Sequence, residues 1–115
     1  MRDKEMLELA AKAAGIIGKY ADDYSYDYYY QGKKSGILYE HDHGGWHVWN
    51  PLTDDCDALR LAVKLDLNVI QAIFYREAQV AGALEKTIFE KWRGNKQSAT
   101  RRAIVRAAAE IGKTL

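Results

Sequence analysis

Apolar residues recur along this chain with two different spacings. In some segments they return every three or four positions, which is typical of a helix with one buried face. In others they alternate with polar residues, which is typical of a strand. The helical spacing predicts three helices, over residues 3–16, 53–65 and 98–112. Asp3, Thr53 and Ser98 are the expected caps, because their side-chain oxygens can accept hydrogen bonds from the free N–H groups of a first turn. Gly112 is expected to end the last helix.

The second predicted helix carries three acidic residues in its first turn, where the helix dipole favours negative charge. These residues are Asp54, Asp55 and Asp57. Its buried face is expected to comprise Leu59, Ala62, Val63 and Leu65.

Five strands are predicted from the alternating pattern and from runs of β-branched and aromatic residues. They cover residues 24–30, 37–41, 46–49, 67–75 and 87–92. Glycine-containing turns separate the first three, which predicts an antiparallel meander, and Gly82 indicates a bulge or a turn before the last strand. The element order αβββαββα predicts an α+β fold, an α-β-α sandwich with three helices packed on one mostly antiparallel sheet of about five strands. The chain is expected to form a single domain, residues 1–115.

Aromatic residues are abundant, and most of the eight tyrosines and three tryptophans lie between residues 20 and 49. One face of the first predicted strand holds Tyr24, Tyr26, Tyr28 and Tyr30. They could form the core face of that strand, but each buried hydroxyl would then need a hydrogen-bond partner. A tyrosine face joined by Trp46 and Trp49 is equally typical of a surface that stacks bases or anchors a partner protein. Both interpretations stay open.

The charge balance and the cysteine count narrow the range of partners. The 17 basic and 16 acidic residues give a net charge of +1, which argues against nucleic acid as a partner because no global positive field attracts phosphate backbones. The single cysteine, Cys56, cannot form an internal disulfide, which indicates a reducing cytosol. No segment approaches the roughly 18 apolar residues that span a bilayer, so we expect a soluble protein with no membrane contact.

Three histidines in the turn region could in principle hold a metal. His41, His43 and His47 lie close together in the sequence, with Cys56 further along. Their spacing matches no established zinc pattern, so we interpret them as exposed turn residues and expect no metal and no cofactor. The chain also has no nucleophilic elbow, phosphate-binding loop or dinucleotide fingerprint. We therefore predict no catalytic residues and a protein that is not an enzyme.

The last predicted helix carries a basic cluster of Arg101, Arg102 and Arg106. A charged helix face is most often simply solvated. Arg101 and Arg102 are nevertheless candidate partners for the phosphate of a ligand.

Three segments resemble one protein family. Residues 7–15, 49–65 and 99–112 are similar to the helices of small phage and prophage proteins grouped as the phage α-β-α sandwich domain. Cys56 stands where that family often has glycine, which argues against a special role for the thiol. The family has no established activity, so the resemblance implies no catalytic residues. It implies a phage or prophage origin and a location in the host bacterial cytoplasm.

These features together favour a non-catalytic phage accessory protein that binds a host target. The target is expected to be a host protein, or a small nucleotide signal that the protein sequesters as a counter-defence. The contacts are expected from the aromatic region and from Arg101 and Arg102. Two alternatives stay open, a nucleic-acid-binding phage regulator and a small metal-dependent enzyme. The chain could also form a homo-oligomer, because ligand pockets in proteins this small often form between subunits.

Overall fold

A computed structural model describes residues 1–25, 33–40, 42 and 44–115 of the chain. The helices and strands follow one another as α1 (Asp3–Ala14), β1 (Lys19–Ser25), β2 (Lys33–Glu40), β3 (Trp46–Trp49), α2 (Asp55–Lys64), β4 (Asn68–Ala72), the 3₁₀ turn η1 (Ile73–Tyr75), β5 (Glu77–Ala83), β6 (Lys86–Lys91) and α3 (Lys96–Gly112). The α+β class is confirmed. No helix within the described ranges is long and apolar enough to cross a membrane.

The strands form two sheets, so the prediction of one five-stranded sheet is wrong. Sheet A has the order β1-β2-β3 and sheet B the order β4-β5-β6, and every neighbouring pair is antiparallel. Each sheet consists of strands that follow one another directly in the sequence. Such hairpin connections pair each strand with its neighbour, and helix α2 separates one set from the other.

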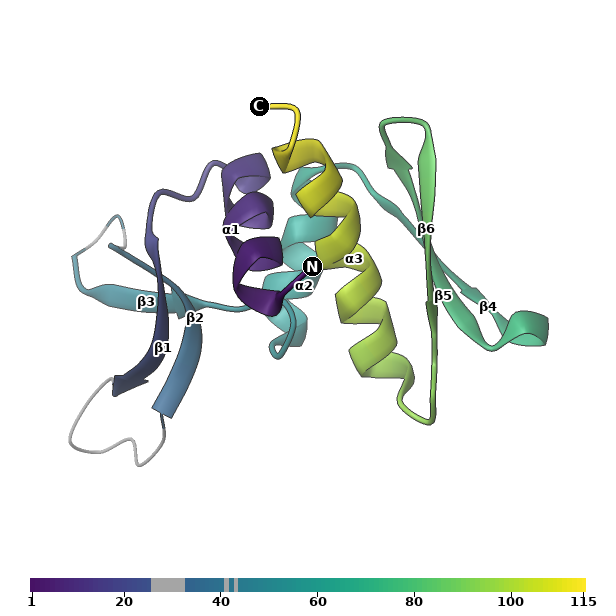
Figure 1. Ribbon diagram of the computed structural model, residues 1–115, viewed down its shortest axis with the longest axis horizontal. Helices are drawn as coiled ribbons and strands as arrows, with labels where there is room; N and C mark the ends of the chain where they lie inside the picture. Colours follow the sequence, from purple (N-terminus) through teal and green to yellow (C-terminus); the bar gives the residue numbers. More distant parts are fainter. Residues whose placement is uncertain (26–32, 41, 43) are drawn as a thin grey trace.

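The three helices lie between the two sheets, which reverses the predicted layering (Figure 1). Helix α1 packs on β1 and β2, α3 packs on β5 and β6, and α3 also contacts both other helices. The physical reason is the composition of α3, which is buried around much of its circumference. Its buried residues are Ala99, Ala103, Ile104, Val105, Ala107, Ala108, Ala109 and Gly112. A helix that is apolar on several sides has to be covered on several sides.

Helices α1 and α3 approach each other closely at the end of α3. A Cβ atom on Gly112 would overlap the backbone of Leu9, so only glycine fits this position without displacement. Gly112 is the last residue of α3, as predicted, but the C-cap is Lys113 with a right-handed backbone, so the glycine serves this contact and not a left-handed cap. Small residues on the facing surfaces, Ala10, Ala103 and Ala107, are completely buried, which is what a short distance between helix axes requires.

The residues that cap the helices differ from those predicted. Arg2 precedes α1 without a side-chain cap, so Asp3 is inside the helix. Asp54, not Thr53, caps α2 by accepting a hydrogen bond from the N–H of Asp57. The cap of α3 is Asn95, not Ser98, and it accepts from the N–H of Ser98 itself. At α2 two suitable residues, Thr53 and Asp54, are adjacent, and at α3 Asn95 and Ser98 are only three positions apart, so spacing alone does not choose between them.

The buried face of α2 is also shifted from the prediction. Leu59 is 65% exposed and Val63 68% exposed, whereas both were expected in the core. The buried residues of the helix are Ala58, Leu61 and Ala62. Both sets satisfy the three- and four-residue spacing of a helix, so the pattern could not distinguish two adjacent stripes.

Sheet B contains one strand more than predicted. The predicted fourth strand, residues 67–75, is the shorter β4 followed by η1, and the unpredicted β5 pairs with both β4 and β6. The hairpin between β5 and β6 turns at Leu84 and Glu85, whose φ angles of 54° and 59° are left-handed. Hairpin turns of this kind usually contain Asn or Gly, so the sequence carried no signal. Gly82, with φ 102°, lies at the irregular register between Val80 and Ala83, which agrees with the predicted bulge or turn at this position.

Sheet A agrees better with the prediction, although its first strand begins five residues earlier than expected. The inner face includes Tyr20, Ile37 and Trp49, which are aligned across the three strands. Strand β2 includes residues 33–36, where a turn had been expected. The predicted alternation at Tyr26, Tyr28 and Tyr30 lies outside the described residues.

Candidate functional site

The structure places the predicted aromatic residues in different environments. Tyr24 is half-buried in β1, and Trp49 is only 6% exposed, inside the core. Trp46 is exposed and is three positions from Trp49 in the same strand, so the two rings lie on opposite faces of sheet A. The structure therefore does not bring Trp46 and Trp49 onto one surface. Tyr26, Tyr28 and Tyr30 lie outside the described residues.

The candidate metal ligands do not converge in the described part of the chain. His47 stacks on Tyr39, with ring centroids 5.9 Å apart. Among the residues whose positions are described, no group of three or more His, Cys, Asp or Glu side chains could hold a metal ion. Cys56 is exposed in the first turn of α2. His41 and His43 lie outside the described residues.

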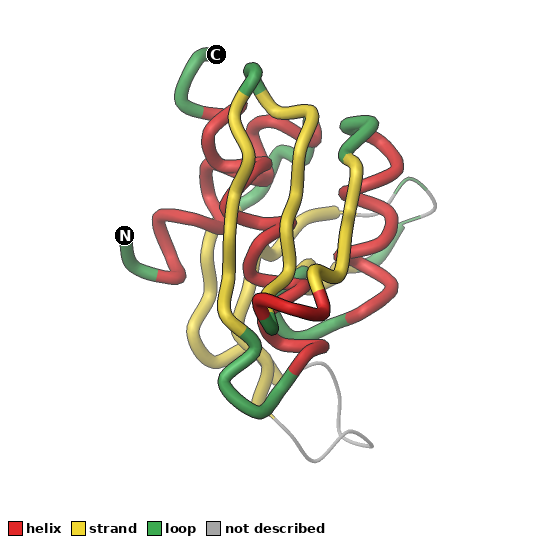
Figure 2. The backbone as a smooth tube through the Cα atoms, turned by 90° about the vertical axis from the view of Figure 1, so that its right-hand side faces the viewer, coloured by secondary structure: helices red, strands yellow, loops and turns green. Residues whose placement is uncertain are grey.

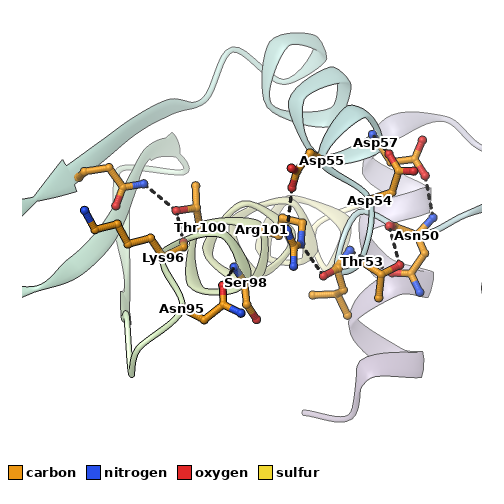
Figure 3. A network of polar contacts seen from close by, with 12 residues as sticks. Asn50, Thr53, Asp54, Asp55, Asp57, Asn95, Lys96, Ser98, Thr100 and Arg101 are labelled. Atoms are coloured by element: carbon orange, nitrogen blue, oxygen red, sulfur yellow. Dashed lines mark hydrogen bonds and ion pairs between the residues drawn. The ribbon is translucent and has the colours of Figure 1, made fainter.

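The predicted arginine cluster on α3 is engaged by the protein itself. Arg101 donates to the carbonyl of Leu52 at 2.8 Å and to Asp55 at 2.7 Å (Figure 3). Arg102 forms an ion pair with Asp3 at 3.2 Å and lies 3.8 Å from Glu90. These contacts join α3 to α2, α1 and β6. Both arginines thus have a structural role, and their role as partners of a ligand phosphate stays a prediction.

Arg106 completes this cluster by binding the same carboxylate as Arg102. It lies 2.7 Å from Glu90 and also donates to the carbonyl of Phe89 at 2.8 Å. A cavity of 380 Å³ adjoins Arg102 and Arg106, but Glu90 and Glu110 line it as well. The mixed charges make this cavity a poor candidate for binding an anion.

A second polar cluster forms the corner where β3 leads into α2 (Figure 3). The buried side chain of Asn50 donates to the carbonyl of Ser35 at 2.8 Å and accepts from the N–H of Leu52 at 2.9 Å. The N–H of Asn50 donates to Asp57 at 3.0 Å. Burial raises the pKa of Asp57, and this hydrogen bond lowers it in part. All of these contacts hold the turn between β3 and α2 in place, so we interpret this cluster as part of the scaffold and not as a ligand site.

The strongest candidate for a ligand site lies at one end of sheet B, where three turns meet. A cavity of 570 Å³ is lined there by Tyr75, Arg76, Lys91, Trp92, Arg93, Gly94 and Lys96. We call this set the cationic-aromatic site. Tyr75 and Arg76 come from the connection between η1 and β5, Lys91 to Gly94 from the end of β6 and the turn after it, and Lys96 from the start of α3.

Backbone hydrogen bonds hold the turns of the cationic-aromatic site together. The N–H of Trp92 donates to the carbonyl of Arg76 at 2.9 Å, and the N–H of Asn95 donates to the carbonyl of Trp92 at 2.8 Å. Arg76 and Arg93 both have left-handed backbones, with φ angles of 50° and 49°. Residues in this region of φ/ψ space cost about 1 kcal/mol or more and concentrate at functional sites.

Side-chain contacts fix the position of the Trp92 ring. Its indole N–H donates to Gln71 of β4 at 2.9 Å, and the Gln71 amide donates to Thr100 of α3 at 2.6 Å. The Lys96 ammonium lies 4.5 Å from the centre of the ring, a cation–π distance. The ring is thereby held between sheet B and α3, with a positive charge over it.

The cations of the site differ in how they are paired. Lys91 lies 3.2 Å from Glu77 and donates to the carbonyl of Tyr75 at 3.0 Å. Arg76, Arg93 and Lys96 are exposed, and over the described ranges no carboxylate forms an ion pair with any of them. They contrast with the paired arginines of α3. A cavity of this volume, within the range of about 300–1,000 Å³ typical of ligand pockets, is therefore bordered by uncompensated positive charge and two aromatic rings.

Sequence reasoning missed this site because its residues come from positions that the pattern assigned to separate elements. Residues 67–75 and 87–92 were predicted as strands and residues 98–112 as a helix. The available signal was the short run Lys91, Trp92, Arg93 and Lys96, in which cations alternate with an aromatic residue. Arg76 joins the run only through the fold.

Comparison with known proteins gives no match, since no family model, no curated protein and no solved structure is significantly similar to this chain. The resemblance to the phage α-β-α sandwich domain therefore stays a prediction.

Proposed function

We propose that this chain is a non-catalytic binding protein and that its ligand is a nucleotide held in the cationic-aromatic site. The observation that carries the proposal is the group of Arg76, Arg93 and Lys96, three cations without a carboxylate partner among the described residues, around one cavity. Like charges held together repel one another, and a bound phosphate would relieve this repulsion. Guanidinium groups also bind phosphate oxygens through two parallel hydrogen bonds.

The aromatic residues favour a nucleotide over a simple phosphate. Tyr75 is exposed, and Trp92 is half-buried and held by Gln71. Rings in such positions can stack a base, and stacking contributes about 1–3 kcal/mol per base. A ligand with a flat ring at one end and phosphate at the other would use both parts of the site.

The biological setting is part of the same proposal. If the chain is a phage or prophage accessory protein, as its resemblance implies, it would act in the cytoplasm of the bacterial host. Binding a host nucleotide signal without converting it would lower the free concentration of that signal. Such sequestration would be a counter-defence that requires affinity and abundance but no catalysis.

The proposal is tested by calorimetric titration of the purified protein with a panel of mononucleotides and linear and cyclic dinucleotides. At least one is expected to bind. Replacing two unpaired cations, in the double variant Arg76→Gln and Arg93→Gln, should weaken binding about 100-fold, since each lost charged hydrogen bond costs about 1.5 kcal/mol and tenfold in affinity corresponds to about 1.4 kcal/mol. The variant Trp92→Phe should weaken it less.

The matched control is Lys4→Gln, which removes one exposed positive charge from α1, away from the site. It should leave the affinity unchanged. Equal losses in Lys4→Gln and in the double arginine variant would reduce the effect to general electrostatics. Absence of binding across the whole panel would contradict the proposal.

A second candidate function, binding of single-stranded nucleic acid, is favoured by one observation. Phe74 is 99% exposed and precedes Tyr75 directly, so a further ring lies beside the cavity, where a neighbouring base could stack. Oligonucleotide affinity that rises with length and falls steeply with salt would support this function. Affinity for mononucleotides equal to that for oligonucleotides would favour the first proposal instead.

A further inference from the structure

The four edge strands of the two sheets differ in how they are protected against pairing with another strand. Natural edges are usually blocked by charges, bulges, proline or short length. Strand β1 has charged residues and an irregular register between Ala21 and Tyr24, β3 has only four residues, and β6 includes Lys86, Glu90 and Lys91. Strand β4 has none of these features.

Strand β4 is an unprotected edge. Its sequence, Asn-Val-Ile-Gln-Ala, contains no charge and no proline, and its register with β5 is regular from Asn68 to Ala72. Four of its five residues are exposed. In Figure 2, which shows the strands of sheet B in yellow, β4 is the short outer strand at one side of the sheet. The N–H and C=O groups that point away from β5 thus form a row open to a further strand.

Helix α2 ends shortly before β4 in the sequence and carries exposed apolar residues. Successive helical residues are rotated by about 100°. On α2, Asp57 and Arg60 line a cavity with Trp49 of sheet A, and Asp55 binds Arg101 of α3. Leu59 and Val63 occupy the remaining side, away from sheet A, where both are exposed.

We propose that this chain forms a homodimer in which β4 of one copy pairs with β4 of the second copy, antiparallel to it. This pairing would join sheet B of each copy into one sheet of six strands. An antiparallel pair of identical strands has two-fold symmetry, so the same surface serves both copies, as in most homodimers. Because β4 carries no charge, the two identical strands meet without the repulsion that two copies of β6 would experience. Leu59 and Val63 of each copy would be covered at the margin of this interface.

Exposed apolar residues on α2, β4 and η1 would contribute to such an interface. A stable interface buries about 800 Å² on each partner. The exposed apolar residues of this region are Leu59, Val63, Val69, Ile70, Ile73 and Phe74. Phe74 alone presents about 200 Å² when fully exposed, and the backbone of β4 adds to the total.

The test is the mass of the full chain by light scattering and sedimentation over a wide range of protein concentration. The expected result is twice the 13.1 kDa of one chain at high concentration. Ile70→Lys introduces the charge that protects other edges, and the double variant Leu59→Glu and Val63→Glu makes the α2 surface acidic. Each should shift the mass to that of one chain at concentrations where the wild type is dimeric.

Two controls carry the same types of change on other surfaces. Phe89→Lys places a lysine on the same outer face as Ile70 but on β6, since Gln79 of β5 aligns with both residues. Ile17→Glu replaces a residue that is 94% exposed outside the region around β4. Both should remain dimeric, and nucleotide binding by the monomeric variants should be retained, which separates this inference from the proposed function.

Three results would overturn the inference. They are a wild type that stays monomeric at all concentrations, a dimer that survives both interface variants, and a dimer that is lost equally in the controls. If the variants do not fold, hydrogen exchange of the wild type decides instead. The amides of β4 should exchange more slowly as the protein concentration rises. Equal exchange rates at low and high concentration would contradict a homodimer. Protection of β4 only in a complex with a different protein would contradict it as well.

Discussion

The two sheets are built alike and differ in what they leave exposed. Each is an antiparallel meander of three strands packed on the central helices. The edges of sheet A are charged and irregular at β1 and short at β3. Sheet B has a neutral, regular edge at β4 and unpaired cations at one end. When the helices form the middle layer, both sheets keep an outer face and edges in solvent, and the side chains placed there distinguish them.

The largest expected effect on the comparison of the two sheets comes from removing one buried isoleucine side chain from each sheet. Ile37 of sheet A and Ile88 of sheet B are both buried against the helices. Replacing either by Ala should lower the free energy of unfolding by about 2–5 kcal/mol. Because α3 contacts sheet B and both other helices, we expect each variant to unfold in one transition in scanning calorimetry. Two transitions, of which only one shifts, would show that the halves unfold separately.

The caps of α2 and α3 offer a second and smaller contrast. Asn95→Ala should cost about 1 kcal/mol of stability, the usual value for a lost cap. It should also weaken nucleotide binding, because loss of the side-chain cap loosens the first turn of the helix that carries Lys96, although the backbone N–H of residue 95 can still donate to the carbonyl of Trp92. Asp54→Ala should cost less, since Asp54 repels the nearby carboxylate of Asp57.

Denaturant titration measures both stabilities, and calorimetric titration measures the binding. The nucleotide affinity of Asp54→Ala should equal that of the wild type. An equal loss of nucleotide affinity in both cap variants would show that the affinity depends on overall stability and not on the local geometry of the cationic-aromatic site.

The smallest expected effect concerns pH at the corner between β3 and α2. Burial raises the pKa of Asp57 above its ordinary value of 3.8, so the folded chain binds this proton more tightly than the unfolded chain. The contribution of Asp57 to stability is therefore complete below pH 3.8 and falls as the pH rises through the folded-state pKa. In Asp57→Asn the amide oxygen can still accept from Asn50 while this fall disappears. Melting temperatures of both proteins over a pH series check this, and a difference independent of pH would contradict it.

The sequence supported the prediction of local elements better than of their arrangement. The helices and the first meander follow from residue spacing, but the layering depended on α3, where a single apolar stripe was expected although Ala103, Val105 and Ala109 are buried on other sides as well. Alanine gives a weak hydrophobic signal because its side chain is small. The same weakness concealed β5, whose buried Ala78 does not resemble a typical strand residue.

The candidate site shows a different limit. Its cations could be read from the sequence, but not which of them have carboxylate partners. Arg101 and Arg102 looked like a free basic cluster, yet their partners Asp55 and Asp3 are distant in sequence. Arg76 and Arg93 looked unremarkable. Only the tertiary structure separates cations used for stability from those available to a ligand.

The position of α3 in the chain has a consequence for how the protein is made. Within each sheet, neighbouring strands are consecutive, so their contacts form over short loops and at low entropic cost. Packing of α1 on α3 joins far more distant residues, as the ion pair between Asp3 and Arg102 spans 99 positions. During synthesis α1 leaves the ribosome before α3, which follows both sheets in the sequence. The contacts of α1 with α3 can therefore form only after both sheets have been translated, although α1 can pack on β1 and β2 earlier.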